Sequence, residues 1–184
     1  MIYSELTRKA MVIAYEAHEG QVDKAGMPYV YHPIHVADGM PDEISTATAL
    51  LHDVVEDTDW DFKRLREEGI PEEVLAPLKL LTRSRDEEYE DYIRRIAKNR
   101  VARLVKLADL EHNSDLSRLP CVSDKDRRRI EKYQRAMEYL KGVETGPRKH
   151  RIPIDPIHFA KQMQLHLQLW NKSVNRSRER QSIS

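Results

Sequence analysis

The stretch HPIHVADGMPDEISTATALLHDVVEDT, residues 32–58, decides the fold class of this sequence. Its Ala and Leu residues recur at helical spacing, which predicts one helix over PDEISTATALLHDVVED (41–57) with a buried face. That helix ends in His52 and Asp53, closely followed by Glu56 and Asp57. Charged side chains are rarely buried in a protein core, so an imidazole and three carboxylates at one end of a core helix are expected to have a specific role.

Helical signals dominate on both sides of this stretch. Apolar residues at helical spacing are preceded by capping residues and followed by Gly or Pro, which delimit further helices. One such signal, a capping box of Thr58 with Asp61, predicts a helix that opens at Thr58 and ends at Gly69. Because strand signals are weak throughout the chain, the predicted fold class is all-α.

The composition changes after Gly142, which suggests a domain boundary. The segment VETGPRKHRIPIDP (143–156) contains three prolines, and the end of the chain is polar and basic. We therefore predict a helical domain over residues 1–142, a linker with a C-terminal helix over 143–170, and a disordered tail over 171–184.

The composition gives no indication of a nucleic-acid-binding, membrane or secreted protein. The 184 residues include 31 basic and 31 acidic ones, so the formal net charge of zero gives no reason to expect nucleic-acid or membrane binding. Neither a membrane span nor a signal peptide is apparent. The single cysteine, Cys121, cannot form an internal disulfide and is expected to be an inert buried thiol in a cytoplasmic protein. No pattern sets an oligomeric state.

The acidic helix end is best explained by a bound cation. Residues three and four apart share a helix face, so His52 and Glu56 lie together, as do Asp53 and Asp57. Crowded carboxylates repel one another unless a cation lies between them, and a mixed His and Asp set suits Mn²⁺, Fe²⁺ or Zn²⁺. The remaining ligands must come from elsewhere in the chain. His32 is one candidate, and the segment LVKLADLEHN (104–113), with Asp109, His112 and Asn113, offers others.

The residues alone also allow a plainer explanation. The pair His-Asp occurs by chance, a helix C-terminus stabilises histidine through its dipole, and acidic helix ends are usually just solvated. Four motifs along the chain carry a resemblance that favours the metal site. They are HEGQVDKAGMPYVYHP (18–33), ALLHDVVEDT (49–58), LVKLADLEHN (104–113) and RIEKY (129–133).

In order and spacing these motifs resemble the HD-superfamily metal phosphohydrolases. The similarity is to the hydrolase domain of RelA/SpoT proteins and to small alarmone hydrolases, over residues 1–142. It implies an HD-domain helical bundle around a single metal ion, usually Mn²⁺, and removal of the 3′-pyrophosphate from guanosine tetra- or pentaphosphate. The implied metal ligands are His32, His52, Asp53 and Asp109. The implied catalytic pair is Glu56 and Asp57. The implied substrate contacts are Lys24, Asn113, Arg129 and Tyr133.

The chemistry of these residues agrees with such a reaction. Two histidines and two carboxylates can fix one divalent ion, Glu56 can orient or deprotonate water, and Lys24 and Arg129 can neutralise phosphate charge. At position 23, however, the chain has Asp where the family usually has the Arg that helps hold guanine. A phosphohydrolase for another nucleotide is therefore a second hypothesis. A non-catalytic nucleotide-binding module is a third, against which the intact Glu56 and Asp57 argue.

Overall fold

A computed structural model describes residues 1–118 and 121–143 of the chain. The described residues are mostly helical, and the only β-type pairing among them is an isolated bridge between Val22 and Pro28, so the predicted all-α class is confirmed. The linker, C-terminal helix and tail predicted over residues 143–184 lie outside the described residues, apart from Val143. The helices are α1 (Glu5–Ala17), α2 (Tyr31–Asp38), α3 (Glu43–Leu51), α4 (Val54–Asp57), α5 (Phe62–Glu67), α6 (Glu72–Leu81), α7 (Tyr89–Ala97), α8 (Arg100–Asn113), a 3₁₀ turn (Leu116–Arg118) and α9 (Asp124–Gly142).

Helix α3 is the centre of the core. It packs against α1, α2, α6 and α8, and every residue from Ser45 to Leu51 is buried. Small side chains on this helix allow its neighbours to approach closely. Its buried hydroxyls are satisfied locally, since Thr46 donates to the Asp42 carbonyl and Thr48 to the Ile44 carbonyl at 2.8 and 2.7 Å. The result is a rigid platform whose C-terminal end carries His52.

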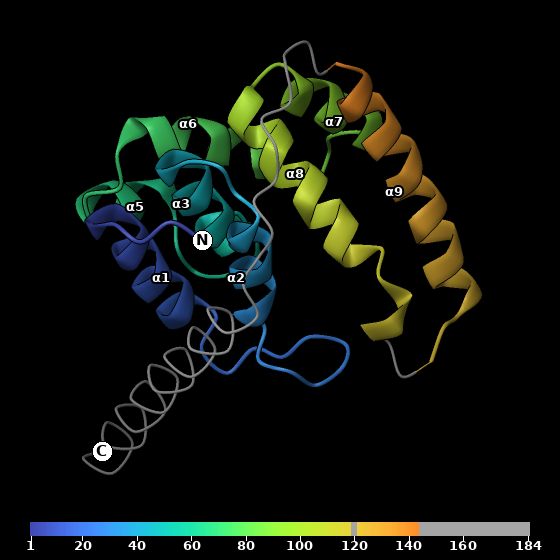
Figure 1. Cartoon of the computed structure of the whole chain (residues 1–184), viewed down its shortest axis with the longest axis horizontal. Helices are drawn as coiled ribbons and strands as arrows, with labels where there is room; N and C mark the ends of the chain where they lie inside the picture. The colour runs from blue at the N-terminus through green and yellow to red at the C-terminus, as the bar shows by residue number, and fades with distance from the viewer. Residues whose placement is uncertain (119–120, 144–184) are drawn as a thin grey trace. The chain divides into compact units, whose positions relative to one another are not determined.

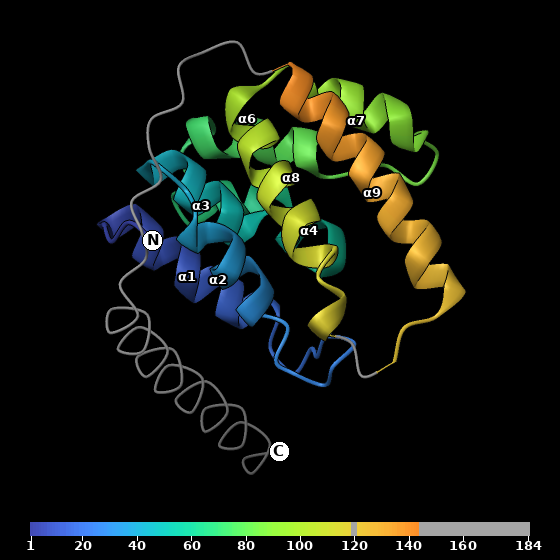
Figure 2. The same ribbon diagram turned by 45° about the vertical axis from the view of Figure 1, so that its right-hand side comes forward.

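Helix α8 joins the two sides of the domain. Figures 1 and 2 show it between the α2 and α3 side and the α7 and α9 side, and it contacts all four helices. Its last turns therefore point Asp109 toward the end of α3.

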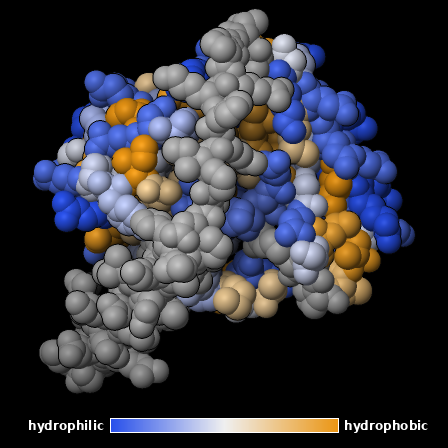
Figure 3. Space-filling view, in the orientation of Figure 1, coloured by the Kyte–Doolittle hydropathy of each residue, from blue (hydrophilic) through white to orange (hydrophobic). Residues whose placement is uncertain are grey.

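Among residues 1–118 and 121–143, no helix is long and apolar enough to span a bilayer. The face shown in Figure 3 is largely hydrophilic, with scattered apolar residues.

Two local predictions about helix boundaries are wrong. The helix predicted over 41–57 breaks at His52 and Asp53, because the His52 side chain donates from Nδ1 to the Ala49 carbonyl at 2.8 Å. An uninterrupted α-helix would use that carbonyl for the backbone N–H of Asp53. Thr58 does not cap the next helix either. Its hydroxyl donates back to the Val54 carbonyl at 2.6 Å and closes α4, and Asp61 caps α5 instead.

The expected burial of Cys121 is also wrong, since this residue is exposed.

Other helix starts agree with the sequence signals. Ser4 and Ser123 each form a complete capping box, and Asp42 does so at the start of α3. Gly69, which follows α5, has a φ of 81°, in the left-handed region that glycine adopts without strain.

Candidate metal centre and active-site pocket

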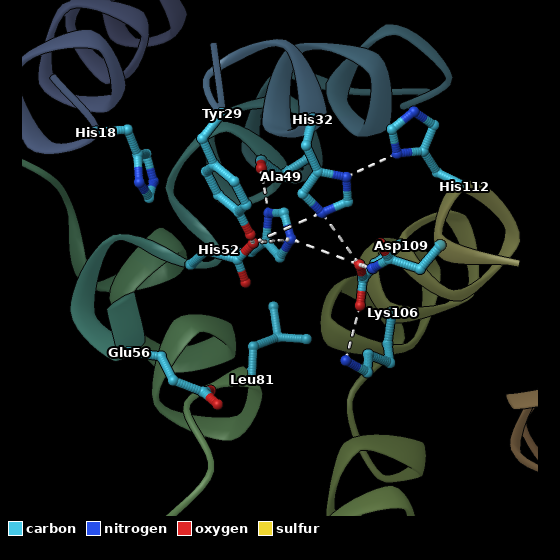
Figure 4. Close-up of polar contacts among 12 residues, drawn as sticks. His18, Tyr29, His32, Ala49, His52, Glu56, Leu81, Lys106, Asp109 and His112 are labelled. Carbon is cyan, nitrogen blue, oxygen red and sulfur yellow. Dashed lines mark hydrogen bonds and ion pairs between the residues drawn. The ribbon is translucent and has the colours of Figure 1, made fainter. Parts of the chain in front are cut away.

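Three buried side chains meet where α2, α8 and the end of α3 approach one another. His32 lies in the first turn of α2, His52 directly follows α3, and Asp109 lies in the last turns of α8. His32 Nε2 is 3.2 Å from Asp109 Oδ1, and His52 Nε2 is 3.8 Å from the same oxygen (Figure 4). One ligand atom from each residue lies within 4.8 Å of the other two, so these residues can hold a metal ion.

Asp53 lies beside this cluster. Its Oδ2 is 3.1 Å from His52 Nε2 and 3.5 Å from His32 Nε2, and it accepts a hydrogen bond from the Tyr29 hydroxyl at 2.5 Å. The structure thus brings together all four residues that the sequence singled out as ligands. Their assignment as a coordination shell remains a prediction.

The donor set fits a divalent cation. The Nδ1–H of His52 donates to the Ala49 carbonyl, so Nε2 is the nitrogen that the neutral imidazole would offer to a metal ion. Among the described residues, this atom lies against the carboxylates of Asp53 and Asp109. Burial disfavours charge on His52, yet the carboxylates of Asp53 and Asp109 raise its pKa to about 10. Burial acts to raise the pKa of Asp53, but the imidazoles of His52 and His32 hold it below its usual range. The cluster therefore strongly favours a positive charge at its centre, which a metal ion would supply.

Other side chains hold the ligands in place. Asp109 accepts hydrogen bonds from Lys106 at 2.7 Å and from Asn113 at 2.6 Å. Burial disfavours the charge of Lys106, but Asp109 keeps its pKa well above the usual value. On the other side, His32 Nδ1 lies 2.7 Å from Nδ1 of His112, whose ring also stacks on His35 at 4.1 Å. These contacts fix the orientation of two candidate ligands.

The bond between His32 and His112 has a definite polarity if His32 binds a metal. For Nε2 to offer its lone pair, Nδ1 must carry the hydrogen and donate it to His112. The substitution His112→Phe removes this acceptor and keeps a ring. We expect affinity for Mn²⁺, measured by competition with a chelator, to fall by about 10- to 100-fold. His112→Asn, which offers an acceptor near the position of Nδ1, should restore much of the affinity. His35→Phe is the matched control, and equal affinities for His112→Phe and the wild type would contradict the assignment.

The two predicted catalytic carboxylates lie in the turn of α4. Glu56 accepts a hydrogen bond from the Arg83 amide at 3.0 Å, and burial, together with Asp53 and Asp57, raises its pKa. The pKa of Asp57 is also raised, by burial and by Asp53. The Asp57 carbonyl accepts from Gln21, whose own carbonyl oxygen is bonded to His18 Nδ1. The His-Glu-Gly-Gln motif therefore anchors the turn of α4, which carries Glu56 and Asp57.

A pocket of about 170 Å³ opens beside the cluster, and Glu56 forms part of its wall. Its lining combines metal-cluster residues, cations and tyrosines. These are His52, Asp53, Glu56, Leu81, Arg83, Tyr89, Tyr92, Lys106, Lys132 and Tyr133. Such a lining suits an anionic ligand that reaches the metal cluster.

The predicted substrate contacts are not all in this pocket. Only Tyr133 lines it. Asn113 is bonded to Asp109, while Lys24 and Arg129 both pair with Asp126, at 3.6 and 3.2 Å. Arg83, Tyr89 and Lys132 also line the pocket and were not predicted from the sequence. The only available signal for them was their residue type, because nothing in the sequence shows that residues 83–89 face α9.

The fold and the site together define an HD-type helical domain with a His and Asp cluster suited to a divalent metal. No protein-family model matches the chain. Over 135 residues, the chain is 38% identical to a guanosine-3′,5′-bis(diphosphate) 3′-pyrophosphohydrolase of Haemophilus influenzae, a match covering 66% of this chain and 20% of that protein. It is 34% identical over 164 residues to the bifunctional (p)ppGpp synthase/hydrolase SpoT of Escherichia coli, covering 82% and 22%.

Solved structures point the same way. A metazoan ortholog of SpoT that hydrolyses ppGpp matches with a TM-score of 0.64 and 26% identity, covering 79% of this chain and 90% of that one. The match covers only about a fifth of the length of these two curated relatives. Its described residues form a RelA/SpoT hydrolase-like domain of the HD type.

Proposed function

We propose that this chain is a metal-dependent phosphohydrolase that removes the 3′-pyrophosphate from guanosine tetra- or pentaphosphate. The observation that carries this proposal is a buried His and Asp cluster that opens into a pocket lined by cations. The similarity to named guanosine-3′,5′-bis(diphosphate) 3′-pyrophosphohydrolases supports the substrate. The cofactor we propose is one Mn²⁺ ion, with Fe²⁺ or Zn²⁺ as alternatives that the same donor set accepts.

In this proposal His32, His52, Asp53 and Asp109 hold the ion. A bound divalent ion supplies Lewis-acid polarisation of the phosphoryl group and acidifies water. Glu56, whose raised pKa brings it nearer to that of an effective general base, orients or deprotonates the attacking water. Asp57 assists it. Attack of water at the phosphorus bonded to the 3′-oxygen breaks that P–O bond, releases pyrophosphate and leaves a 3′-hydroxyl on the nucleoside 5′-diphosphate, or on the 5′-triphosphate when the substrate is the pentaphosphate.

The test is product analysis across a panel of nucleotides with Mn²⁺ present. Release of pyrophosphate from guanosine tetraphosphate supports the proposal. Release of orthophosphate from a nucleoside monophosphate indicates a nucleotidase instead. Binding without release of either product indicates a non-catalytic module, the third hypothesis.

A second candidate, hydrolysis of another nucleotide, is favoured by Asp23. Its Oδ1 accepts hydrogen bonds from the amides of Ala25 and Met27, at 2.8 and 3.0 Å, so this side chain organises the loop. A carboxylate in that role cannot stack on a base as a guanidinium plane does, and it repels nearby phosphate.

Loose base discrimination follows from this loop. We expect the adenosine analogue of guanosine tetraphosphate to be cleaved within about tenfold of the guanosine compound, which corresponds to roughly 1.4 kcal/mol. The measurement is kcat/KM for pyrophosphate release from both compounds. A much larger preference for guanine would mean that other residues recognise the base.

A further inference from the structure

Lys132 is a lysine of the pocket wall without a counterion among the described residues. Its Nζ lies 4.3 Å from the centre of the Tyr89 ring and 5.8 Å from that of Tyr133. Within residues 1–118 and 121–143 it makes no ion pair or hydrogen bond, and Glu90 favours its charge only from beyond ion-pair distance. Lys106, another cation of this pocket, differs because it is paired with Asp109.

Arg83 adds a second positive charge, which forms no ion pair with any described residue. Its guanidinium donates to the backbone carbonyl of Glu87, at 3.0 Å from Nε and 2.5 Å from Nη2, and Arg83 lies over the Tyr89 ring at 5.7 Å. Burial, Arg83 and Lys106 together lower the pKa of Lys132. Cations gathered in one small pocket repel one another, and an anion between them would relieve that repulsion.

Tyr89 supplies a hydrogen-bond donor at the same place. Its buried hydroxyl has no hydrogen-bond partner within the described residues, whereas the hydroxyl of neighbouring Tyr92 donates to the Leu81 carbonyl at 2.6 Å. A buried hydroxyl without a partner costs free energy unless a ligand satisfies it. This part of the pocket therefore has two cations and a free donor.

We propose that Lys132, Arg83 and Tyr89 form a binding site for the outer phosphate of a pyrophosphate group. The phosphate that reacts lies at the metal cluster, where His52 and Asp53 line the same pocket. The outer phosphate extends to the cation pair. This assignment rests on the proposed pyrophosphohydrolase function, and it explains how the pocket would prefer a pyrophosphate to a single phosphate.

The test is equilibrium dialysis of inorganic pyrophosphate, and separately of orthophosphate, against the full chain loaded with Mn²⁺. Lys132→Met keeps the aliphatic stem and removes the charge. We expect it to weaken pyrophosphate binding by about tenfold or more, as expected for a lost charge-assisted hydrogen bond. Orthophosphate, which fits at the metal end, should lose less than about threefold by the same reasoning. Lys132→Arg should retain most of the affinity for pyrophosphate.

Lys141→Met, which replaces an exposed lysine on the same helix, is the matched control for net charge. Thermal melting of each variant establishes that it is folded. Wild-type affinity in Lys132→Met, equal losses for both anions, or an equal loss in Lys141→Met would each overturn the assignment. Because the readout is binding, it is independent of turnover. A chain that does not hydrolyse guanosine tetraphosphate but loses pyrophosphate affinity in Lys132→Met would refute the proposed function and keep the phosphate site.

Discussion

Replacing Asp109 by Asn is expected to abolish both the bound divalent ion and hydrolysis. Asp109 Oδ1 faces both candidate ligand histidines, and the amide that replaces it is a weak, neutral donor to a cation. We expect metal affinity to fall by more than about 100-fold, which exceeds the loss typical of an outer-shell partner. Elemental analysis of the purified variant and a release assay measure the two effects together.

This variant also leaves Lys106 without its counterion in a mostly buried position, which destabilises the fold. The double variant Lys106→Met with Asp109→Asn removes that unpaired charge. It should be at least as stable as the single variant Asp109→Asn, and it should still bind no metal. Asp91→Asn, which alters an exposed carboxylate on α7, is the control for charge removal. A folded Asp109→Asn protein with a full complement of metal would show that Asp109 is not a ligand.

Replacing Glu56 by Gln separates chemistry from metal binding. Glu56 lines the same pocket as His52 and Asp53, and it accepts a hydrogen bond from the Arg83 amide, which a Gln side-chain oxygen can still accept. The variant should therefore keep its metal and its melting temperature. We expect turnover to fall by about two to four orders of magnitude, the usual cost of losing a general base.

Steady-state kinetics with guanosine tetraphosphate measures this effect. Glu73→Gln, which alters an exposed glutamate on α6, is the matched control and should have wild-type kcat. A near-wild-type rate in Glu56→Gln would move the role of the base to Asp57. A variant without metal would instead make Glu56 a ligand.

Local chemistry predicts much of this fold from the sequence. The starts of α1, α3 and α9 follow from capping residues whose side chains bond within three positions, so their signal is contained in a short window. The start of α5 shows where such signals become ambiguous. Thr58 and Asp61 can each cap a helix, and only the backward bond from Thr58 to Val54 decides between them.

The site illustrates a different limit. Spacing along the chain groups His52 with Asp53, but it cannot bring His32 and Asp109 to them, because that depends on how α2 and α8 pack against α3. The residues alone offered His32 and Asp109 only as candidates among others, and the resemblance to known hydrolases assigned them as ligands. Lys24 and Arg129 came from the same resemblance, and both pair with Asp126, which sequence reasoning did not consider as their partner. Lys132 and Arg83 were missed because their shared pocket depends on the packing of α9 beside α7.

The most direct test of the central proposal is phosphorus-31 NMR of guanosine tetraphosphate incubated with the full chain, with and without Mn²⁺. We predict one pyrophosphate for each guanosine 5′-diphosphate formed, no orthophosphate, and no reaction once a chelator has removed the metal. Orthophosphate as the first product, or pyrophosphate release that persists in metal-stripped protein, would contradict the proposal.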